Sequence, residues 1–168
     1  FNSIKQLVIS TSVFGAFKKL DCPPTFSMIE FWKHSMGTAI AAEVLAKHLK
    51  LAAPEEVFIC GLTHDMGKLV LLMVDKEIFL NTCILAKEKG LSFYQAEIAT
   101  EAPLHTYWGQ VLAKKWQLPE LITATIKDHH STNPKLRSSA DPEINRIIDL
   151  IFIANQAVHY FNYGNSGY

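Results

Sequence analysis

The chain has little cysteine and no excess of charge of either sign. Its three cysteines, Cys22, Cys60 and Cys83, lie far apart and form no C-x-x-C pair, so they fit reduced thiols better than a disulfide framework. The 16 basic and 16 acidic residues cancel, which removes any general attraction to nucleic acid or to anionic lipid. These absences predict a cytoplasmic protein that binds neither nucleic acid nor a membrane.

The sequence also lacks targeting and membrane-spanning signals. We expect no apolar run of the roughly 20 residues that a membrane helix needs, and the chain has neither the charged start nor the cleavage site of a signal peptide. Its 168 residues, 49% of them hydrophobic, suffice for one well-filled core. We therefore expect one domain over residues 1–161 and an irregular tail, rich in Asn and Gly, over residues 162–168.

Helix signals recur along the chain, whereas sustained alternation of apolar and polar residues does not. This pattern predicts an all-α, compact multi-helix domain. Capping boxes, helix-starting prolines and a stopping glycine place helices over residues 4–18, 27–50, 54–74 and 77–89, then after Ser92, Pro103 and Pro119, and finally from Asp141 onward. A polar, exposed loop is expected over residues 131–141. The apolar face of the last helix carries one polar residue, Asn155.

Histidine and aspartate gather in apolar segments. His64 and Asp65 are adjacent, and His34, His105 and the pair His129-His130 lie in comparable surroundings. A single histidine on an apolar helix face is usually a hydrogen-bonded core residue. Imidazole nitrogens and a carboxylate together, however, suit zinc, iron or manganese, and separate helices can project them into one crevice.

The other two histidines, His48 and His159, have no such context and are interpreted as ordinary surface or packing residues. The histidine pair at residues 129 and 130 is also weaker evidence than the rest. Successive helical residues differ by about 100° in direction, so one ring can bind metal while the other caps carbonyls or faces water.

Four segments, taken in order and spacing, resemble a known family. They are Phe-Trp-Lys-His-Ser at 31–35, Gly-Leu-Thr-His-Asp-Met-Gly-Lys at 61–68, His105 through Trp108-Gly109, and Trp-Gln-Leu-Pro at 116–119 before the histidine pair. This arrangement resembles the HDOD domain, the HD-related output domain of bacterial signalling proteins, over roughly residues 1–160. The resemblance implies that a further helical portion precedes Phe1.

The wider HD superfamily contains metal-dependent phosphohydrolases, and the resemblance carries their ligand positions onto this chain. The minimal metal set matches His34, His64 and Asp65; the added positions of cyclic-dinucleotide phosphodiesterases match His105, His129 and His130; the lysine that approaches substrate phosphate matches Lys68. Where the family pattern has a later aspartate, this chain has Asn155. A neutral amide is a weaker ligand than a carboxylate, so we expect lower metal affinity.

The sequence leaves three functions open. The first is a signalling output module with a divalent metal site (Fe, Mn or Zn), little or no hydrolase activity and a signalling protein as partner. The second is a metal-dependent phosphohydrolase or phosphodiesterase acting on a nucleotide or cyclic nucleotide, with Asp65 as the bridging ligand and Lys68 as a phosphate clamp. The third is a structural domain whose histidines form a hydrogen-bonded polar core. Lys68 is also compatible with a side chain that leaves the core for solvent.

Two departures weigh against a specific hydrolase. The amide of Asn155 removes one anionic ligand, and the Gly-Tyr-Pro signature of the cyclic-dinucleotide phosphodiesterases is replaced by Ser-Thr-Asn-Pro at 131–134. We therefore favour the signalling module, and the enzyme remains the alternative.

Overall fold

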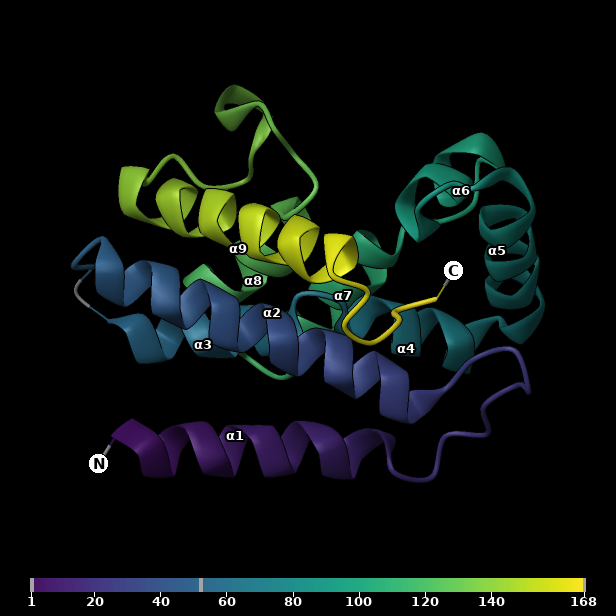
Figure 1. Ribbon diagram of the computed structural model, residues 1–168, viewed down its shortest axis with the longest axis horizontal. Coiled ribbons are helices and arrows are strands. Elements are labelled where there is room, and N and C mark those ends of the chain that lie inside the picture. Colours follow the sequence, from purple (N-terminus) through teal and green to yellow (C-terminus); the bar gives the residue numbers. More distant parts are fainter. Residues whose placement is uncertain (1, 52, 168) are drawn as a thin grey trace.

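The computed structural model describes residues 2–51 and 53–167, without the side chains of residues 2–7, 9 and 10. Within these residues every regular element is a helix, which confirms the all-α fold class (Figure 1). The elements are α1 (Asn2–Phe17), α2 (Met28–His48), α3 (Pro54–Thr63), α4 (Met66–Val74), α5 (Lys76–Lys89), α6 (Phe93–Ala99), α7 (His105–Lys115), α8 (Glu120–Asp128), η1 (Pro134–Leu136) and α9 (Pro142–Tyr160).

The helices form two packed groups. In the first, α2 packs along α3 and α9, α1 lies against α3, and α8 contacts α3 and α9. In the second, α4 packs across α7, and α5 and α6 follow at one end of the molecule (Figure 1). The turn between α3 and α4 joins the two groups, which also meet where α7 contacts α8.

Local sequence signals explain several helix ends. The Ser27 hydroxyl accepts a hydrogen bond from the Glu30 amide and caps α2, but the Glu30 side chain accepts a hydrogen bond from Lys33 and so does not complete the expected capping box. At α6 the box between Ser92 and Gln95 is complete. Gly90 ends α5 in the left-handed conformation, with φ of 64°.

Other boundaries differ from the prediction. The helix expected over residues 54–74 is broken by a turn at His64 and Asp65. Pro103 and Pro119 precede their helices rather than occupying the first helical position, since α7 begins at His105 and α8 at Glu120. The loop over 131–141 contains η1, and it contributes the buried side chains of Arg137 and Ser139.

Aromatic side chains from several helices fill the core. Phe31, Phe79 and Phe93 are fully buried, and the Phe79 ring contacts Phe93 at 5.4 Å between centroids. In α1, Val13 and Phe17 are buried whereas Val8 is exposed. Helical spacing in the sequence also places Ile4 and Leu7 on the apolar face of this helix, but their side chains lie outside the described residues.

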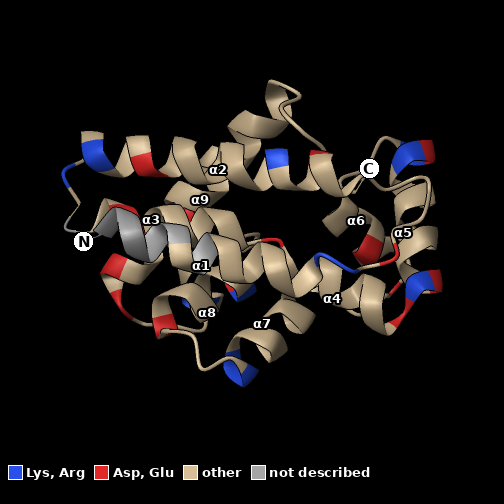
Figure 2. Ribbon diagram, turned by 90° about the horizontal axis from the view of Figure 1, so that it is seen from below, with Lys and Arg blue, Asp and Glu red and all other residues tan. Residues whose placement is uncertain are grey.

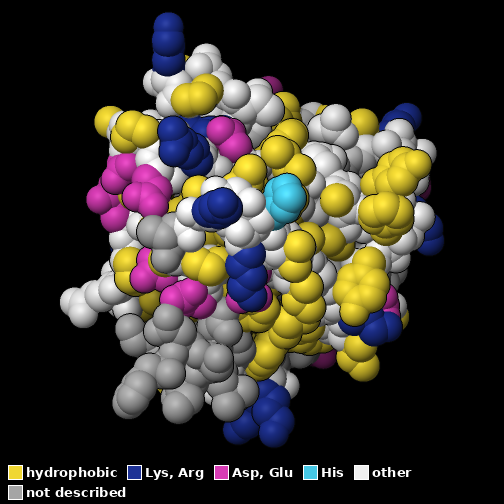
Figure 3. All heavy atoms as spheres, turned by 60° about the vertical axis from the view of Figure 1, so that its left-hand side comes forward, with side chains coloured by type: hydrophobic (Ala, Val, Ile, Leu, Met, Phe, Trp, Pro, Cys, Tyr) yellow, Lys and Arg dark blue, Asp and Glu magenta, His cyan; other side chains and the backbone are white. Residues whose placement is uncertain are grey.

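One segment contradicts the expectation that no stretch is long and apolar enough to cross a membrane. Residues Pro54–Val74 meet that length and composition, but 78% of the window is buried inside the protein. Such burial is typical of a core helix. Basic and acidic residues are interspersed elsewhere (Figure 2), and apolar side chains form a band on the face shown in Figure 3.

Candidate metal centre

The carboxylate of Asp65 lies at the centre of a buried cluster of histidines. The side chain is 1% exposed and stands in the turn between α3 and α4. Each of its oxygens faces two Nε2 atoms: Oδ1 lies 3.4 Å from His105 and 3.5 Å from His129, and Oδ2 lies 3.4 Å from His64 and 3.7 Å from His34. The structure thus brings together ring nitrogens from α2, the α3–α4 turn, α7 and the end of α8.

Glycines allow the helices that carry these residues to approach closely. A Cβ atom on Gly61 of α3 would lie 2.6 Å from the Ala39 Cα atom of α2. A Cβ atom on Gly67 of α4 would lie 1.8 Å from the carbonyl oxygen of His105 in α7. The first contact holds the His64 turn against α2, and the second holds Asp65 against α7.

Hydrogen bonds at Nδ1 orient three of the rings. Nδ1 of His64 lies 2.7 Å from the carbonyl oxygen of Gly61, and Nδ1 of His129 lies 3.0 Å from that of Ile126. Nδ1 of His105 lies 2.7 Å from the Glu97 carboxylate. A carbonyl or carboxylate oxygen can only accept, so each Nδ1 donates, and in a neutral ring Nε2 then keeps its lone pair for the cluster.

Several buried polar atoms in the cluster have no hydrogen-bond partner among the described residues. They are both ring nitrogens of His34, Nε2 of His64, Oδ1 of Asp65, Nε2 of His130 and Oδ1 of Asn155. Buried polar atoms without partners are costly, so each one requires an explanation. Bound metal would account for one nitrogen of each ring and for the oxygens of Asp65 and Asn155, because these atoms can act as ligands, whereas the second nitrogen of His34 carries the ring proton.

The ligand atoms fall into two groups that share Asp65. One group contains Asp65, His105, His129 and His130, and the other contains His34, His64 and Asp65; within each group the ligand atoms lie within 4.8 Å of one another. Nitrogen ligands with one carboxylate fit zinc, iron or manganese. The residues present therefore fit a metal ion.

The electrostatics of the cluster favour neutral rings around one charged carboxylate. Burial lowers the pKa of His34 to about 2 and that of His64 to about 3. Burial raises the cost of a charged Asp65, but the Lys68 ammonium and the neighbouring histidines outweigh it and hold its pKa well below the usual value. Metal ligation needs neutral imidazole and ionised carboxylate, which is this combination.

His105 differs from the other rings. Burial opposes its charged form, but the carboxylates of Glu97 and Asp65 together raise its pKa above the usual value. By contrast, burial and neighbouring histidines lower the pKa of His130. The cluster therefore contains one histidine with a raised pKa beside several whose pKa is lowered.

Lys68 points into the cluster, and the solvent-reaching alternative is wrong. The residue is 3% exposed, and its Nζ atom donates hydrogen bonds to Oδ2 of Asp65 at 2.7 Å and to Oγ of Ser166 at 2.9 Å. His159, which was expected to be an ordinary residue, also belongs to the cluster, because its ring centroid lies 4.5 Å from that of His34. Burial lowers the pKa of His159 to about 4.

A cavity of about 780 Å³ opens beside the cluster. His130, Asn155 and His159 line it together with residues of α5, of the loop over 90–92 and of the segment after α9. Asn155, where the family pattern has aspartate, is 2% exposed. The amide thus lines the same cavity as His130 and His159.

Sequence reasoning missed two buried polar residues at this site. Glu97 is fully buried and binds His105 through two hydrogen bonds, and an acidic residue on the inner face of a short helix was the available signal. Ser166 lies in the tail that was expected to be irregular and is fully buried. No local sequence pattern indicates that contact.

Comparisons with known proteins identify the relatives of this chain. The HDOD domain family matches residues 1–132. A crystal structure of an HDOD domain protein with unknown function from Geobacter sulfurreducens matches 100% of this chain and 54% of its own, with a TM-score of 0.86 and 25% sequence identity. The structure of a protein from Shewanella amazonensis SB2B, named "Putative phosphohydrolase", matches 96% of this chain and 56% of its own, with a TM-score of 0.75 and 24% identity, and so supports the fold alone.

A curated relative is an uncharacterized protein from Treponema pallidum (strain Nichols). It is 25% identical over 134 residues, which cover 79% of this chain and 25% of that protein. The chain therefore spans about a quarter of this relative and, as given above, about half of each solved structure.

Proposed function

Because the chain belongs to the HDOD domain family, we propose that it is a signalling output module that binds a divalent metal ion at Asp65 and has little or no hydrolase activity. One observation carries the proposal: four histidine Nε2 atoms surround the two oxygens of a single buried aspartate. The unpartnered polar atoms of the same cluster support a bound cation over a closed hydrogen-bonded core.

Two features weigh against hydrolysis. Asp65 is the one carboxylate in both ligand groups, and Asn155 adds no charge, so the site offers little negative charge for holding two ions. In addition, the Lys68 ammonium already occupies Oδ2 of Asp65. A bridging carboxylate needs both of its oxygens for the ions that it joins. In this proposal the metal stabilises the output state, and a partner signalling protein reads that state through surface contacts.

A metal-dependent phosphohydrolase or phosphodiesterase is the second candidate, and the paired ligand groups favour it. Both groups converge on Asp65, and the cavity of about 780 Å³ beside them is within the size range of small-ligand sites. A bound metal pair would supply an activated water and would stabilise charge on phosphate. Lys68 would then leave Asp65 to contact a phosphate oxygen of a nucleotide or cyclic nucleotide.

Elemental analysis of the untagged protein tests the proposal. We expect close to one Fe, Mn or Zn ion per chain, lost in His129→Ala and Asp65→Ala and retained in His48→Ala, whose histidine is exposed at the end of α2. Hydrolysis of a generic phosphoester and of cyclic nucleotides should stay at background. Metal-dependent turnover that disappears in both variants would establish the enzyme instead. A chain free of metal after growth in metal-supplemented medium would leave the histidines as a polar core.

A further inference from the structure

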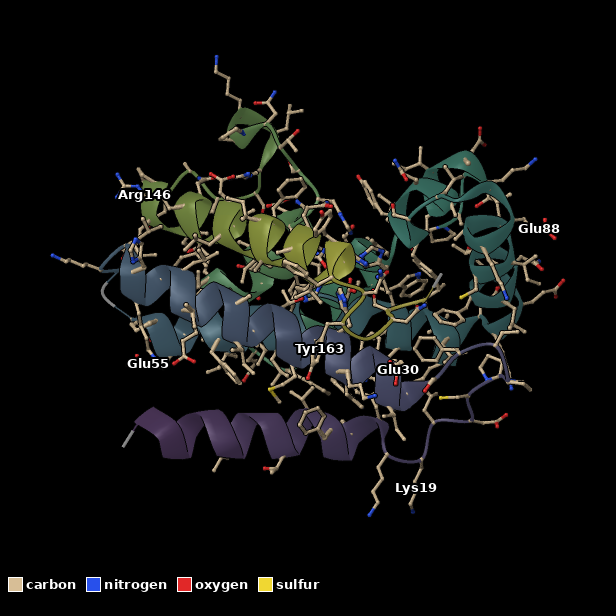
Figure 4. All side chains as sticks on the ribbon, viewed as in Figure 1. Lys19, Glu30, Glu55, Glu88, Arg146 and Tyr163 are labelled. Carbon is tan, nitrogen blue, oxygen red and sulfur yellow. The ribbon has the colours of Figure 1, made fainter. Side chains whose placement is uncertain are left out.

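The segment after α9 returns to the candidate metal centre. Residues 162–167 follow α9, pass alongside α2 and end beside Lys68 (Figure 1). Figure 4 shows Tyr163 of this segment close to the part of α2 that carries Glu30. We call residues 162–167 the C-terminal strap.

Backbone contacts seat the strap on α2. The Asn165 amide donates a hydrogen bond to the carbonyl oxygen of Glu30 at 3.0 Å. Gly164 has φ of 75°, and a Cβ atom there would lie 2.3 Å from the backbone nitrogen of His34. Both the conformation and the space therefore require glycine at this position. The strap thus lies directly on the helical turn that carries His34.

The last part of the strap is buried against the cluster. Ser166 is fully buried, and Gly167 lies against the Phe93 ring, where a Cβ atom would be 3.0 Å from Cδ2. The Ser166 hydroxyl accepts a hydrogen bond from Lys68 Nζ at 2.9 Å, and the same Nζ donates to Oδ2 of Asp65 at 2.7 Å. Ser166 therefore helps to fix the ammonium on one oxygen of the central carboxylate.

That oxygen belongs to one of the two ligand groups. Oδ2 faces Nε2 of His34 and of His64, whereas Oδ1 faces His105 and His129. An ammonium and a divalent cation cannot share Oδ2, because like charges at such short range repel strongly in a buried site. With the strap seated, the group around Oδ1 is open to a metal and the group around Oδ2 is blocked.

We propose that the C-terminal strap is an autoinhibitory element that holds Lys68 on Asp65 and thereby limits the centre to one metal ion. Release of the strap frees Lys68 to leave Oδ2, and His34, His64 and Asp65 then take a second ion. This proposal rests on the proposed metal-binding function. Asn165 and Gly167 also line the cavity, so release of the strap widens the entrance on the same side.

Two variants of the full chain loosen the strap, each with a matched control. Ser166→Ala removes the acceptor for Lys68, and Gly164→Ala places a Cβ atom against the His34 backbone. Ser12→Ala and Gly15→Ala are the controls, because Ser12 is exposed on α1 and a Cβ atom on Gly15 would meet nothing within 4 Å. Circular dichroism establishes that each variant is folded.

Metal stoichiometry is measured by equilibrium dialysis against Mn²⁺ or Zn²⁺ followed by elemental analysis. We expect one ion per chain for the native protein and both controls, and a second ion in both strap variants. In Ser166→Ala this second ion should bind about tenfold more tightly than a second ion binds to the native chain. One ion in every protein would overturn the strap proposal and leave the proposed function standing. No ion in any protein would overturn the proposed function.

A second measurement does not depend on metal and tests the strap proposal even if no ion binds to any of the proteins. Lys68 is 3% exposed, so acetic anhydride should label it slowly in the native chain and at least about tenfold faster in Ser166→Ala and Gly164→Ala. Peptide mass spectrometry reports the labelled fraction, with the exposed Lys87 as internal reference. Equal labelling of Lys68 in native and variant chains would show that the strap does not hold it.

Discussion

Glu97 binds His105 through both of its carboxylate oxygens. Oε1 accepts a hydrogen bond from the His105 backbone amide and Oε2 accepts one from Nδ1, each at 2.7 Å, and both residues are fully buried. The carboxylate therefore caps the start of α7 and fixes the ring with Nε2 toward Oδ1 of Asp65. Because a carboxylate behind a ligating imidazole orients the ring and raises its basicity, Glu97 would be a positioning residue for the metal ion that we propose.

Glu97→Gln should weaken metal binding by about 10- to 100-fold without removing a ligand. A glutamine can accept only one of the two hydrogen bonds and carries no charge behind the ring. Competition with a chromophoric chelator measures the affinity, and the shift of the His105 Nδ1 proton in NMR spectra reports the altered bond. The exposed Glu88, labelled in Figure 4, provides the control Glu88→Gln. Unchanged affinity in Glu97→Gln would contradict the positioning role.

Asn155→Asp should tighten metal binding by about tenfold or more, because it restores a carboxylate at a buried position that lines the same cavity as His130. The same change should lower the melting temperature of the metal-free protein, since a buried charge without a partner is costly. Calorimetry with and without metal measures both effects. Gln156→Glu adds the same charge at the next, exposed residue and should do neither. Equal behaviour of the two variants would place the later ligand elsewhere.

The metal-free protein should lose stability as the pH falls from about 6.5 toward 3. Burial lowers the pKa of His34 to about 2 and of His64 to about 3 from the ordinary 6.5, so the unfolded chain binds protons in this window that the folded chain excludes. Each ring then costs up to about 1.4 kcal/mol per pH unit. The raised pKa of His105 acts above this window, where its stabilising effect is lost as the pH rises, whereas the lowered pKa of His129, His130 and His159 adds to the loss of stability at low pH.

Urea unfolding between pH 4.5 and 7 measures this slope. His34→Gln should reduce it, whereas His48→Gln on the exposed end of α2 should leave it unchanged. A stability that does not vary with pH in this range would show that the buried rings are already protonated in the folded protein.

Gly67→Ala should destabilise the protein by about 1 to 3 kcal/mol or more, because the added Cβ atom would lie 1.8 Å from the His105 carbonyl oxygen and 2.7 Å from the Gly109 nitrogen. Both contacts are backbone atoms that cannot turn away, so α4 must move from α7. Metal affinity should fall with stability, since that movement separates Asp65 from His105. Gly15→Ala, in open space on α1, should be neutral or slightly stabilising in the same urea titration.

The helical architecture could be predicted from local signals, and the residues show why. The Ser27 and Ser92 caps, the Gly90 stop and the Asp141-Pro142 start act on their own backbone, so residue type and spacing are sufficient. The break at His64 and Asp65 was missed because the apolar pattern continues through it without a proline, and tertiary packing of Gly61 and Gly67 places the turn.

The residues of the candidate site also divide into those that the sequence indicated and those that it did not. His34, His64, Asp65, His105, His129 and His130 were indicated by residue type and family resemblance, and the structure brings them around one carboxylate. Ser166 and His159 could not be found from sequence, because their contacts with Lys68 and His34 join positions far apart in the chain. Nothing in the residues around either position marks such a contact.

The turn between α3 and α4 also has a mechanical meaning. His34 belongs to the helices packed around α2, His105 belongs to the helices packed around α4, and Asp65 stands in the connection between the two groups. An ion held at Asp65 would restrict rotation of one group of helices relative to the other while leaving each group intact. Metal binding would then stiffen the molecule, and a partner protein that binds a distant surface can sense that change.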